Sequence, residues 1–373
     1  MPPAINTPIP DDPSIGAIVA RTGAYAPRGN YFRSTRLKRD FHEGTTCFHV
    51  MSRTCGGEVL FDDVEKEALR RLLLRMTAFL GVELLTYCVM KNHFHALIRV
   101  PTLAEWGQPF EGEGGEERLL RHLGTFYSKA FMHRLRHQLQ EMRRMNDERR
   151  AQQTLENFKK RFCDISVFMM ELKVRFSRWF NKRHERKGTL WMGPFRSVLV
   201  EGAGDPLRTM AAYIDLNPVR AGLVKKPEDY RWCGYADAMA GQKVAQQGLC
   251  TVMARKLPEW ERAHGDEEFG VRAGYRRMIY EHARLIMTRD GKVRRKGLSP
   301  AEVERVTLHD RGRVPEASLL MQSVRHFSQG LAIGRKEWVE RVFKAHRDSF
   351  GPRRRSGARQ ISGADELHAL RRL

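Results

Sequence analysis

Cysteine is scarce in this sequence and is never paired in a short motif. None of the six cysteines in the 373-residue chain forms a CxxC pair, which excludes a zinc ribbon and a thioredoxin-like redox motif. A GxxxxGK(S/T) phosphate-binding loop is also missing, so a P-loop nucleotide site is not expected. The apolar runs fall far below the roughly 18–20 residues of a membrane span, and no signal-peptide pattern begins the chain. We therefore expect an intracellular protein with reduced thiols and no membrane partner.

Negative charge is the next deficit. The chain has 66 Lys and Arg against 44 Asp and Glu, a formal net charge of +22. Such an excess favours a polyanionic partner, of which nucleic acid is the commonest; the alternative is a solvated basic surface without a specific partner. With 41% hydrophobic residues, the chain has enough apolar side chains for a folded core. The expected location is cytoplasmic, associated with the nucleoid when bound to DNA.

Hydrophobic periodicity predicts an α+β fold. Alternating apolar residues indicate strands and spacings of three and four indicate helices. The order strand, helix, hairpin, helix, strand is that of a ferredoxin-like βαββαβ sandwich. The predicted strands cover 45–52, 82–90, 93–100 and 196–200, and the predicted helices cover 62–80, 165–182 and 205–216.

The remaining segments predict the domain organisation. Segment 1–30 is interpreted as a flexible arm, and 31–235 as the main domain. A polar helical insertion at about 103–160 interrupts that domain, opening with a Gly- and acid-rich loop. Segment 236–350 is interpreted as a basic, helical C-terminal region, and 351–373 as a flexible basic tail.

One pattern with metal-binding chemistry is His93-Phe94-His95. Alternate residues of a strand face the same side, so both imidazoles can approach one ion while Phe94 faces the core. Imidazole suits divalent transition metals and tolerates harder ions when oxygens complete the shell. With 14 histidines in the chain, an HxH also arises by chance, and the alternative is a pair of partly buried structural histidines.

A second pattern is Tyr213-Ile214-Asp215-Leu216-Asn217-Pro218. Tyr213 and Asn217 are four residues apart on a predicted helix, so a phenol and an amide oxygen share one face. Asn217 is then a candidate metal ligand and Tyr213 a candidate nucleophile. The alternative is a core tyrosine followed by an asparagine helix cap, a role that does not exclude metal ligation.

Basic and aromatic residues are interleaved after residue 172. Cations that follow phosphates and rings that stack on bases are typical of a single-strand-binding surface. The alternative is a solvated helix face with Trp179 in the core. His133 and His137, four apart on another predicted helix, lack the glutamate of an HExxH site and are interpreted as solvated. The candidate DNA-binding residues are Arg175, Arg178, Lys182, Arg183, Arg186, Lys187, Trp191 and Arg196.

Four blocks of sequence together resemble a known family. CFHVMSR (47–53), YCVMKNHFHALI (87–98), FNKRHERKGTLWMGPFRS (180–197) and AYIDLNPVRAGLV (212–224) are similar in order and character to the HUH single-tyrosine transposases. The similarity points to the branch that includes the REP-associated tyrosine transposases. It covers roughly residues 31–235, and the long insertion and the last third of the chain are extra.

The resemblance implies a reaction and a site. Tyr213 would be the nucleophile of a 5′-phosphotyrosine intermediate in DNA transposition or recombination. His93 and His95 would bind a divalent metal ion, Mg²⁺ or Mn²⁺, with Asn217 at a position that is often glutamine in relatives. The implied partner is single-stranded DNA that bears hairpins. Relatives include monomers and dimers, so a homodimer stays open.

Three other functions share some of these features. A non-catalytic DNA-binding regulator derived from a transposase would have the same charge and fold. A metal hydrolase would use the histidine pair with water and would not need Tyr213. An RNA-binding domain of the RRM type shares the predicted topology, but its aromatic RNP strand is missing from the sequence.

Overall fold

The computed structural model describes residues 37, 44–261, 270–282, 286–287, 293–295, 304, 327, 330–352, 354–361 and 366–371. The predicted N-terminal arm, 1–30, lies outside them. The described chain divides into two compact units. Unit 1 comprises Asp63–Val82 and Val100–Leu190. Unit 2 comprises the described parts of Thr35–Asp62, Glu83–Arg99 and Trp191–Leu373.

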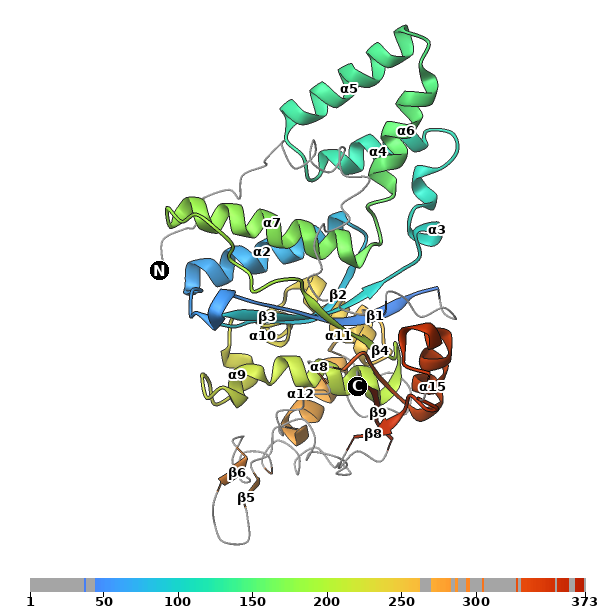
Figure 1. Cartoon of the computed structure of the whole chain (residues 1–373). Helices are drawn as coiled ribbons and strands as arrows, with labels where there is room; N and C mark the ends of the chain where they lie inside the picture. The colour runs from blue at the N-terminus through green and yellow to red at the C-terminus, as the bar shows by residue number, and fades with distance from the viewer. Residues whose placement is uncertain are drawn as a thin grey trace. The chain divides into compact units, whose positions relative to one another are not determined.

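Unit 2 contains a seven-stranded sheet in the order β2-β3-β1-β4-β7-β9-β8 (Figure 1). β1 is antiparallel to β4, β2 is antiparallel to β3, and β4 is parallel to β7. The four predicted strands are present within one or two residues at their ends. The strands are β1 (Thr46–Arg53), β2 (Glu83–Val89), β3 (His93–Val100), β4 (Arg196–Val200), β7 (Ala332–Gly334), β8 (Arg359–Gln360) and β9 (His368–Leu370).

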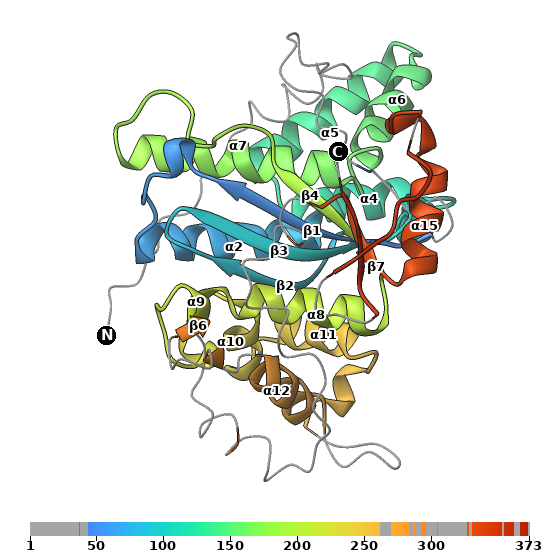
Figure 2. The same ribbon diagram turned by 60° about the horizontal axis from the view of Figure 1, so that its bottom comes forward.

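Helices of unit 2 pack on the sheet through small residues. α8, α10 and α11 contact β2, as Figure 2 shows. A Cβ on Gly248 of α11 would lie 2.4 Å from the carbonyl oxygen of Leu85, so only glycine permits this approach. The helices are α8 (Gly204–Asp215), α9 (Asn217–Arg220), α10 (Gly234–Met239), α11 (Lys243–Val252), α12 (Val271–His282) and α15 (Lys336–Ala345).

Unit 1 is helical. α2 packs against α7, and the insertion forms helices that pack on one another. The predicted polar helical insertion forms three helices with a shared apolar side that includes Leu119, Leu135 and Leu155. The predicted loop before them contains a short helix. The helices are α2 (Asp63–Phe79), α3 (Leu103–Trp106), α4 (Gly115–Gly124), α5 (Lys129–Arg144), α6 (Glu148–Lys159) and α7 (Ile165–Arg183).

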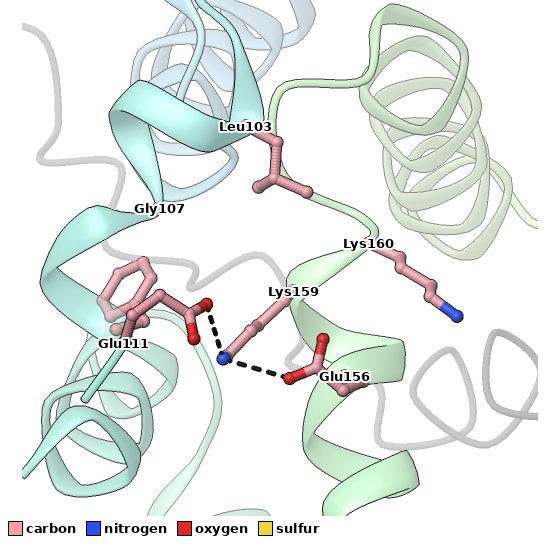
Figure 3. A pocket seen from close by; sticks show the side chains of 7 residues that line it. Leu103, Gly107, Glu111, Glu156, Lys159 and Lys160 are labelled. Atoms are coloured by element: carbon pink, nitrogen blue, oxygen red, sulfur yellow. Dashed lines mark hydrogen bonds and ion pairs between the residues drawn. The ribbon is translucent and has the colours of Figure 1, made fainter. Parts of the chain in front are cut away.

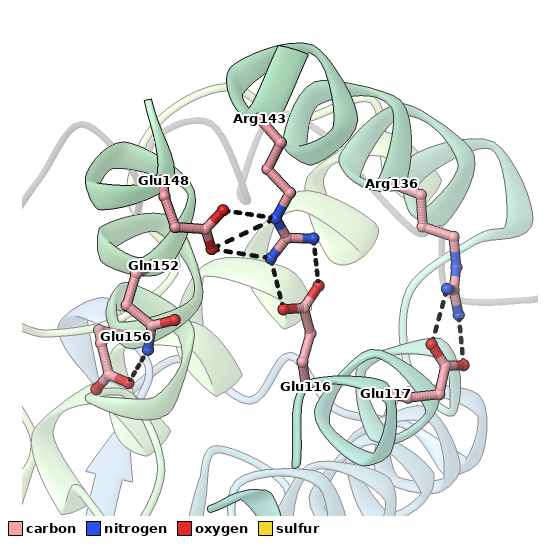
Figure 4. Close-up of polar contacts among 7 residues, drawn as sticks. All are labelled: Glu116, Glu117, Arg136, Arg143, Glu148, Gln152 and Glu156. Carbon is pink, nitrogen blue, oxygen red and sulfur yellow. Dashed lines mark hydrogen bonds and ion pairs between the residues drawn. The ribbon is translucent and has the colours of Figure 1, made fainter. Parts of the chain in front are cut away.

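Ion pairs connect the insertion helices on their exposed side. Arg143 of α5 bridges Glu116 of α4 at 2.7 Å and Glu148 of α6 at 3.1 Å (Figure 4). Arg136 and Glu117 form a second pair between α5 and α4 at 3.1 Å. Exposed pairs each contribute little, so the apolar side carries most of the packing energy.

The C-terminal third differs from the sequence-based prediction. It was predicted to be helical with a flexible tail, yet β7, β8 and β9 extend the sheet of unit 2. Each of these strands has only two or three residues, too short for an alternation pattern to appear in the sequence.

Several short elements complete the described structure. α8 ends at Asp215, and Pro218 lies in the first turn of α9, where its missing N–H costs nothing. None of the described helices is both long enough and apolar enough to cross a membrane. A separate two-stranded sheet contains β5 (Ile286–Met287) and β6 (Val293–Arg295), and the 3₁₀ turns are Cys55–Gly57, Gln108–Phe110, Pro227–Asp229, Leu257–Glu259 and Arg347–Ser349.

Candidate functional site

Three histidines meet at the centre of the sheet in unit 2. His93 and His95 lie on β3, and the neighbouring strand β1 contributes His49. The ring centroids of His93 and His95 are 5.0 Å apart, and those of His49 and His95 are also 5.0 Å apart and stacked. Phe94 is fully buried, as the alternation of β3 predicts.

Both histidines of β3 have a hydrogen-bond partner at Nδ1. Nδ1 of His95 lies 2.8 Å from Nε2 of His49, and Nδ1 of His49 lies 2.7 Å from the carbonyl oxygen of Phe327. Nδ1 of His93 lies 2.7 Å from Oδ1 of Asn92, whose amide nitrogen donates to the carbonyl of Gly57. That second bond identifies which end of the Asn92 amide faces His93.

Burial makes this cluster neutral. His49 and His95 are 1% and 3% exposed. Burial lowers the pKa of His49 to about 4, and burial followed by the charge of Arg53 lowers the pKa of His93 to about 4. Burial, followed by the neighbouring His49, lowers the pKa of His95 well below its usual value. Neutral imidazole is the form that binds metals.

Tyr213 lies on α8 and faces the histidines. Its ring centroid is 5.9 Å from that of His49 and 6.0 Å from that of His95, both edge-on. The ring of Phe327 stacks on Tyr213 at 4.8 Å, and Tyr213 is 8% exposed. A residue of the C-terminal region therefore contacts both the tyrosine and, through its carbonyl, His49.

α9 places a cation against the same tyrosine. The guanidinium carbon of Arg220 lies 4.0 Å from the ring centroid of Tyr213, and the guanidinium donates to the tyrosine's backbone carbonyl. Burial lowers the pKa of Arg220. Asn217 donates from Nδ2 to the carbonyls of Tyr213 and Ile214, at 3.1 and 3.2 Å. The C-cap residue of α8 is Leu216 and Asn217 begins α9, so the predicted asparagine cap is one residue off. The Asn217 side chain still satisfies carbonyls at the end of α8 with its amide nitrogen, which leaves the amide oxygen for another role.

The residue types of this site suit a divalent metal, with an incomplete protein shell. Within the described part of the chain, no three His, Cys, Asp or Glu side chains are arranged to hold a metal ion. The Nδ1 atoms of His93 and His95 both face hydrogen-bond partners, which leaves both Nε2 atoms for a metal. Oxygen ligands from an amide, water or phosphate would then have to complete the coordination.

Two of the candidate DNA-binding residues are interior. Arg175 is 5% exposed and forms an ion pair with Glu171, and Trp191 is 8% exposed and packs edge-on against Phe61 and Phe94. Both were expected on a nucleic-acid surface. The helical period places Glu171 one turn from Arg175, but it does not reveal that both side chains are buried.

The other basic candidates are more accessible. Lys182 and Lys187 are exposed in unit 1, and Arg196 is exposed at the start of β4 in unit 2. Arg183 pairs with Glu65 at 3.1 Å. The two remaining candidates, Arg178 and Arg186, are half-buried, and Trp179 is in the core of unit 1, as the alternative interpretation held.

Two further features of unit 1 do not form a binding site. A small pocket between α3 and α6 contains Lys159, whose ammonium lies 2.7 Å from Glu111 and 3.1 Å from Glu156 (Figure 3). The lysine charge is thereby neutralised. His133 and His137 are exposed on α5, which agrees with their interpretation as solvated.

Three members of the cluster were not singled out from the sequence. His49 alternates with apolar residues in a predicted strand, and Arg220 follows Tyr213 by seven residues, two helical turns. The alternation around His49 and the spacing of Arg220 are visible in the sequence, but neither indicates a site until the strand pairing is known. Phe327 has no local signal, because it is 278 residues from the histidine that its carbonyl contacts.

Fold and site together define a mixed α/β protein in which histidines on two strands cluster with a tyrosine and an arginine on two helices. No protein-family model matches the sequence, and no curated protein matches it. A solved structure, described as "Structure of the REP associates tyrosine transposase bound to a REP hairpin", is distantly similar. It has 14% sequence identity and a TM-score of 0.32, and the match covers 65% of this chain and 97% of that chain. A similarity this low adds nothing to the case for any activity.

Proposed function

We propose that this chain is a metal-dependent enzyme that cleaves and rejoins single-stranded DNA through Tyr213. The observation that carries the proposal is the cluster of His93 and His95 on β3 with Tyr213 on α8. The ring centroids of His93 and His95 are 5.0 Å apart, and those of His95 and Tyr213 are 6.0 Å apart. Two neutral imidazoles beside a phenol are the groups such a reaction needs. The net charge of +22 supports a polyanionic substrate.

Each residue has a defined task in this proposal. The phenol oxygen of Tyr213 loses its proton and attacks phosphorus. The bond to the 3′ oxygen breaks, that oxygen takes up a proton and leaves as a free 3′-hydroxyl, and the tyrosine keeps a 5′-phosphodiester. The covalent bond preserves the energy for rejoining, so no ATP is needed. Arg220 holds the ring and backbone of Tyr213 in place. A divalent ion on His93 and His95, with Asn217 as a third ligand, would supply charge stabilisation at the phosphate.

The order of elements also supports this proposal. β1, α2, β2, β3, α7 and β4 follow one another along the chain in the βαββαβ order, with the insertion after β3. The strand order β2-β3-β1-β4 is that of a ferredoxin-like sheet. We infer that residues 31–235 form a domain of the HUH transposase type, with the C-terminal strands added at the β4 edge.

Covalent capture of DNA tests the proposal. The full chain is incubated with labelled, hairpin-bearing single-stranded DNA and Mn²⁺ or Mg²⁺, and the products are separated on a denaturing gel. We expect a protein–DNA adduct that disappears with EDTA and with Tyr213→Phe, while DNA binding persists. The control is Tyr230→Phe, which removes another buried hydroxyl, hydrogen-bonded to the carbonyl of Val89.

The outcomes separate the competing functions. An adduct that survives Tyr213→Phe would contradict the assignment of the nucleophile. Metal-dependent cleavage that never leaves an adduct would indicate a hydrolase that uses water. Binding to a range of hairpins without cleavage in either metal would favour a DNA-binding regulator.

A further inference from the structure

We propose that His49 is a positioning residue that presents Nε2 of His95 as a ligand, and that the C-terminal region orients His49. This inference rests on the proposed function, because it assigns a role toward the metal of that site. Its basis is the chain of hydrogen bonds from the Phe327 carbonyl through His49 to His95, with distances of 2.7 and 2.8 Å.

The direction of these bonds follows from the chemistry of the groups. A backbone carbonyl only accepts, so Nδ1 of His49 carries the proton and donates to Phe327. In a neutral ring the other nitrogen then has a lone pair, so Nε2 of His49 accepts from Nδ1 of His95. The remaining nitrogen of His95, Nε2, is left with its lone pair and without a proton.

His93 also has its proton on Nδ1 and a lone pair on Nε2, because of a different hydrogen-bond partner. The amide nitrogen of Asn92 donates to the carbonyl of Gly57, so its oxygen faces His93 and accepts from Nδ1. His93 and His95 therefore present the same ring nitrogen, each fixed by an acceptor behind it. Such acceptors orient a metal-binding imidazole and raise its basicity.

The hydrogen-bond acceptors behind His93 and His95 differ in their position along the chain. Asn92 is adjacent to His93 in sequence, whereas His49 comes from another strand and is 1% exposed. Its own partner, Phe327, belongs to the C-terminal region and is 278 residues from His49 in sequence. The orientation of His95 thus depends on a residue far along the chain, and the same residue stacks on Tyr213.

Nitrogen NMR of the metal-free full chain tests the hydrogen-bond chain directly. In protein with ¹⁵N-labelled histidine, protonated and unprotonated ring nitrogens resonate far apart, and the His95→Gln variant assigns the signals of His95. We expect His95 to carry its proton on Nδ1 in the wild type and in His49→Gln, which keeps an acceptor. A proton on Nε2 of His95 in the wild type would overturn the inference.

Metal affinity provides the second measurement, made by Mn²⁺ titration followed by electron paramagnetic resonance. We expect His49→Ala to weaken Mn²⁺ binding by about 10- to 100-fold and His49→Gln to recover most of it. The matched control is Val50→Ala, the next residue on β1, which is fully buried on the opposite face. It lowers stability through lost packing and leaves the affinity unchanged.

The results distinguish failure of this inference from failure of the proposed function. Equal Mn²⁺ affinity in the wild type and His49→Ala would overturn the role of His49 alone. If Val50→Ala and His49→Ala weaken Mn²⁺ binding equally, the effect of His49 is one of packing alone, and the inference is also overturned. A wild-type chain that binds no Mn²⁺ with or without hairpin DNA would contradict the metal site itself, and the inference with it.

Discussion

Asp215 in unit 2 is a buried carboxyl group with a raised pKa. Asp215 follows Ile214 on α8 and is fully buried, where it accepts hydrogen bonds from Thr86 and Tyr275, both at 2.6 Å. Burial raises the pKa of Asp215 to about 7, and these hydrogen bonds oppose the shift. The carboxyl lies two residues from Tyr213 and connects α8 to β2 and α12. Its ionisation is therefore coupled to the stability of the helix that carries the candidate nucleophile.

This coupling predicts a pH dependence that Asp215→Asn removes. The folded pKa of Asp215, about 7, is above the unfolded value, so its contribution to stability is present below about pH 4 and is lost as pH rises through 7. We therefore expect the unfolding free energy of Asp215→Asn, relative to that of the wild type, to increase between pH 4 and 8 by at most about 4 kcal/mol. Urea denaturation across this range measures the difference.

Two comparisons make this result specific. The buried histidines have the opposite sign, since their lowered pKa values make stability rise between about pH 4 and 6.5, but this term is common to both proteins. Asp205→Asn, at an exposed position on the same helix, should show the wild-type profile. A difference between Asp215→Asn and wild type that stays constant with pH would mean that the pKa of Asp215 is the same in the folded and unfolded states, and would contradict the raised value.

Among the elements, the C-terminal strands decide how the sheet of unit 2 ends. β7 pairs in parallel with β4, and α15 packs on β7 and β9. Glu201, just after β4, accepts from the backbone N–H of Arg335 at 2.7 Å and from its guanidinium. This carboxylate joins the predicted domain to the start of α15. The added strands therefore depend on a polar contact as well as on the ladder.

Glu201→Ala should destabilise this junction. It leaves the N–H of Arg335 without its acceptor, and we expect a loss of roughly 1–3 kcal/mol in the free energy of unfolding. Urea denaturation measures the loss. The control is Glu337→Ala, an exposed carboxylate in the first turn of α15, with an expected loss below about 1 kcal/mol. Equal losses in the two variants would show that Glu201 contributes no more than a surface charge.

At the scale of the whole molecule, the excess of basic residues dominates. The charge of +22 extends over both units, and the exposed candidates Lys182 and Lys187 belong to unit 1 while the histidine cluster belongs to unit 2. If the substrate is single-stranded DNA, each phosphate contact releases a counterion, so affinity falls with salt. The slope of log affinity against log salt concentration gives the number of phosphate contacts without a structure of the complex.

A double substitution measures the share of unit 1 in this binding. Lys182→Gln with Lys187→Gln should reduce the slope of log affinity against log salt by about 1.4, if each lysine contacts one phosphate. Fluorescence anisotropy with labelled hairpin DNA, between 50 and 200 mM salt, gives the slope. Lys129→Gln with Lys160→Gln removes the same charge from exposed positions on the insertion. A slope that changes equally in both pairs would indicate a general charge effect and no specific surface.

Much of this protein follows from local sequence pattern. Periodicity predicted the strands and helices of 45–100 and 165–216, because side-chain alternation and helical spacing are properties of neighbouring residues. The spacing of His93 and His95 on one strand, and of Tyr213 and Asn217 around one helical turn, was likewise readable. Local spacing alone therefore makes these residues site candidates.

Tertiary structure decided the rest, since contacts between distant segments have no local pattern. Pairing of β1 beside β3 brought His49 to His95, and Phe327 reached the cluster from the far end of the chain. Arg175 lies over the ring of Phe126 and Trp191 packs against Phe61 and Phe94, and these contacts join segments that are far apart in the sequence. The sequence alone thus determined which residue types the site would use. Only the long-range packing of the sheet determined which residues surround them.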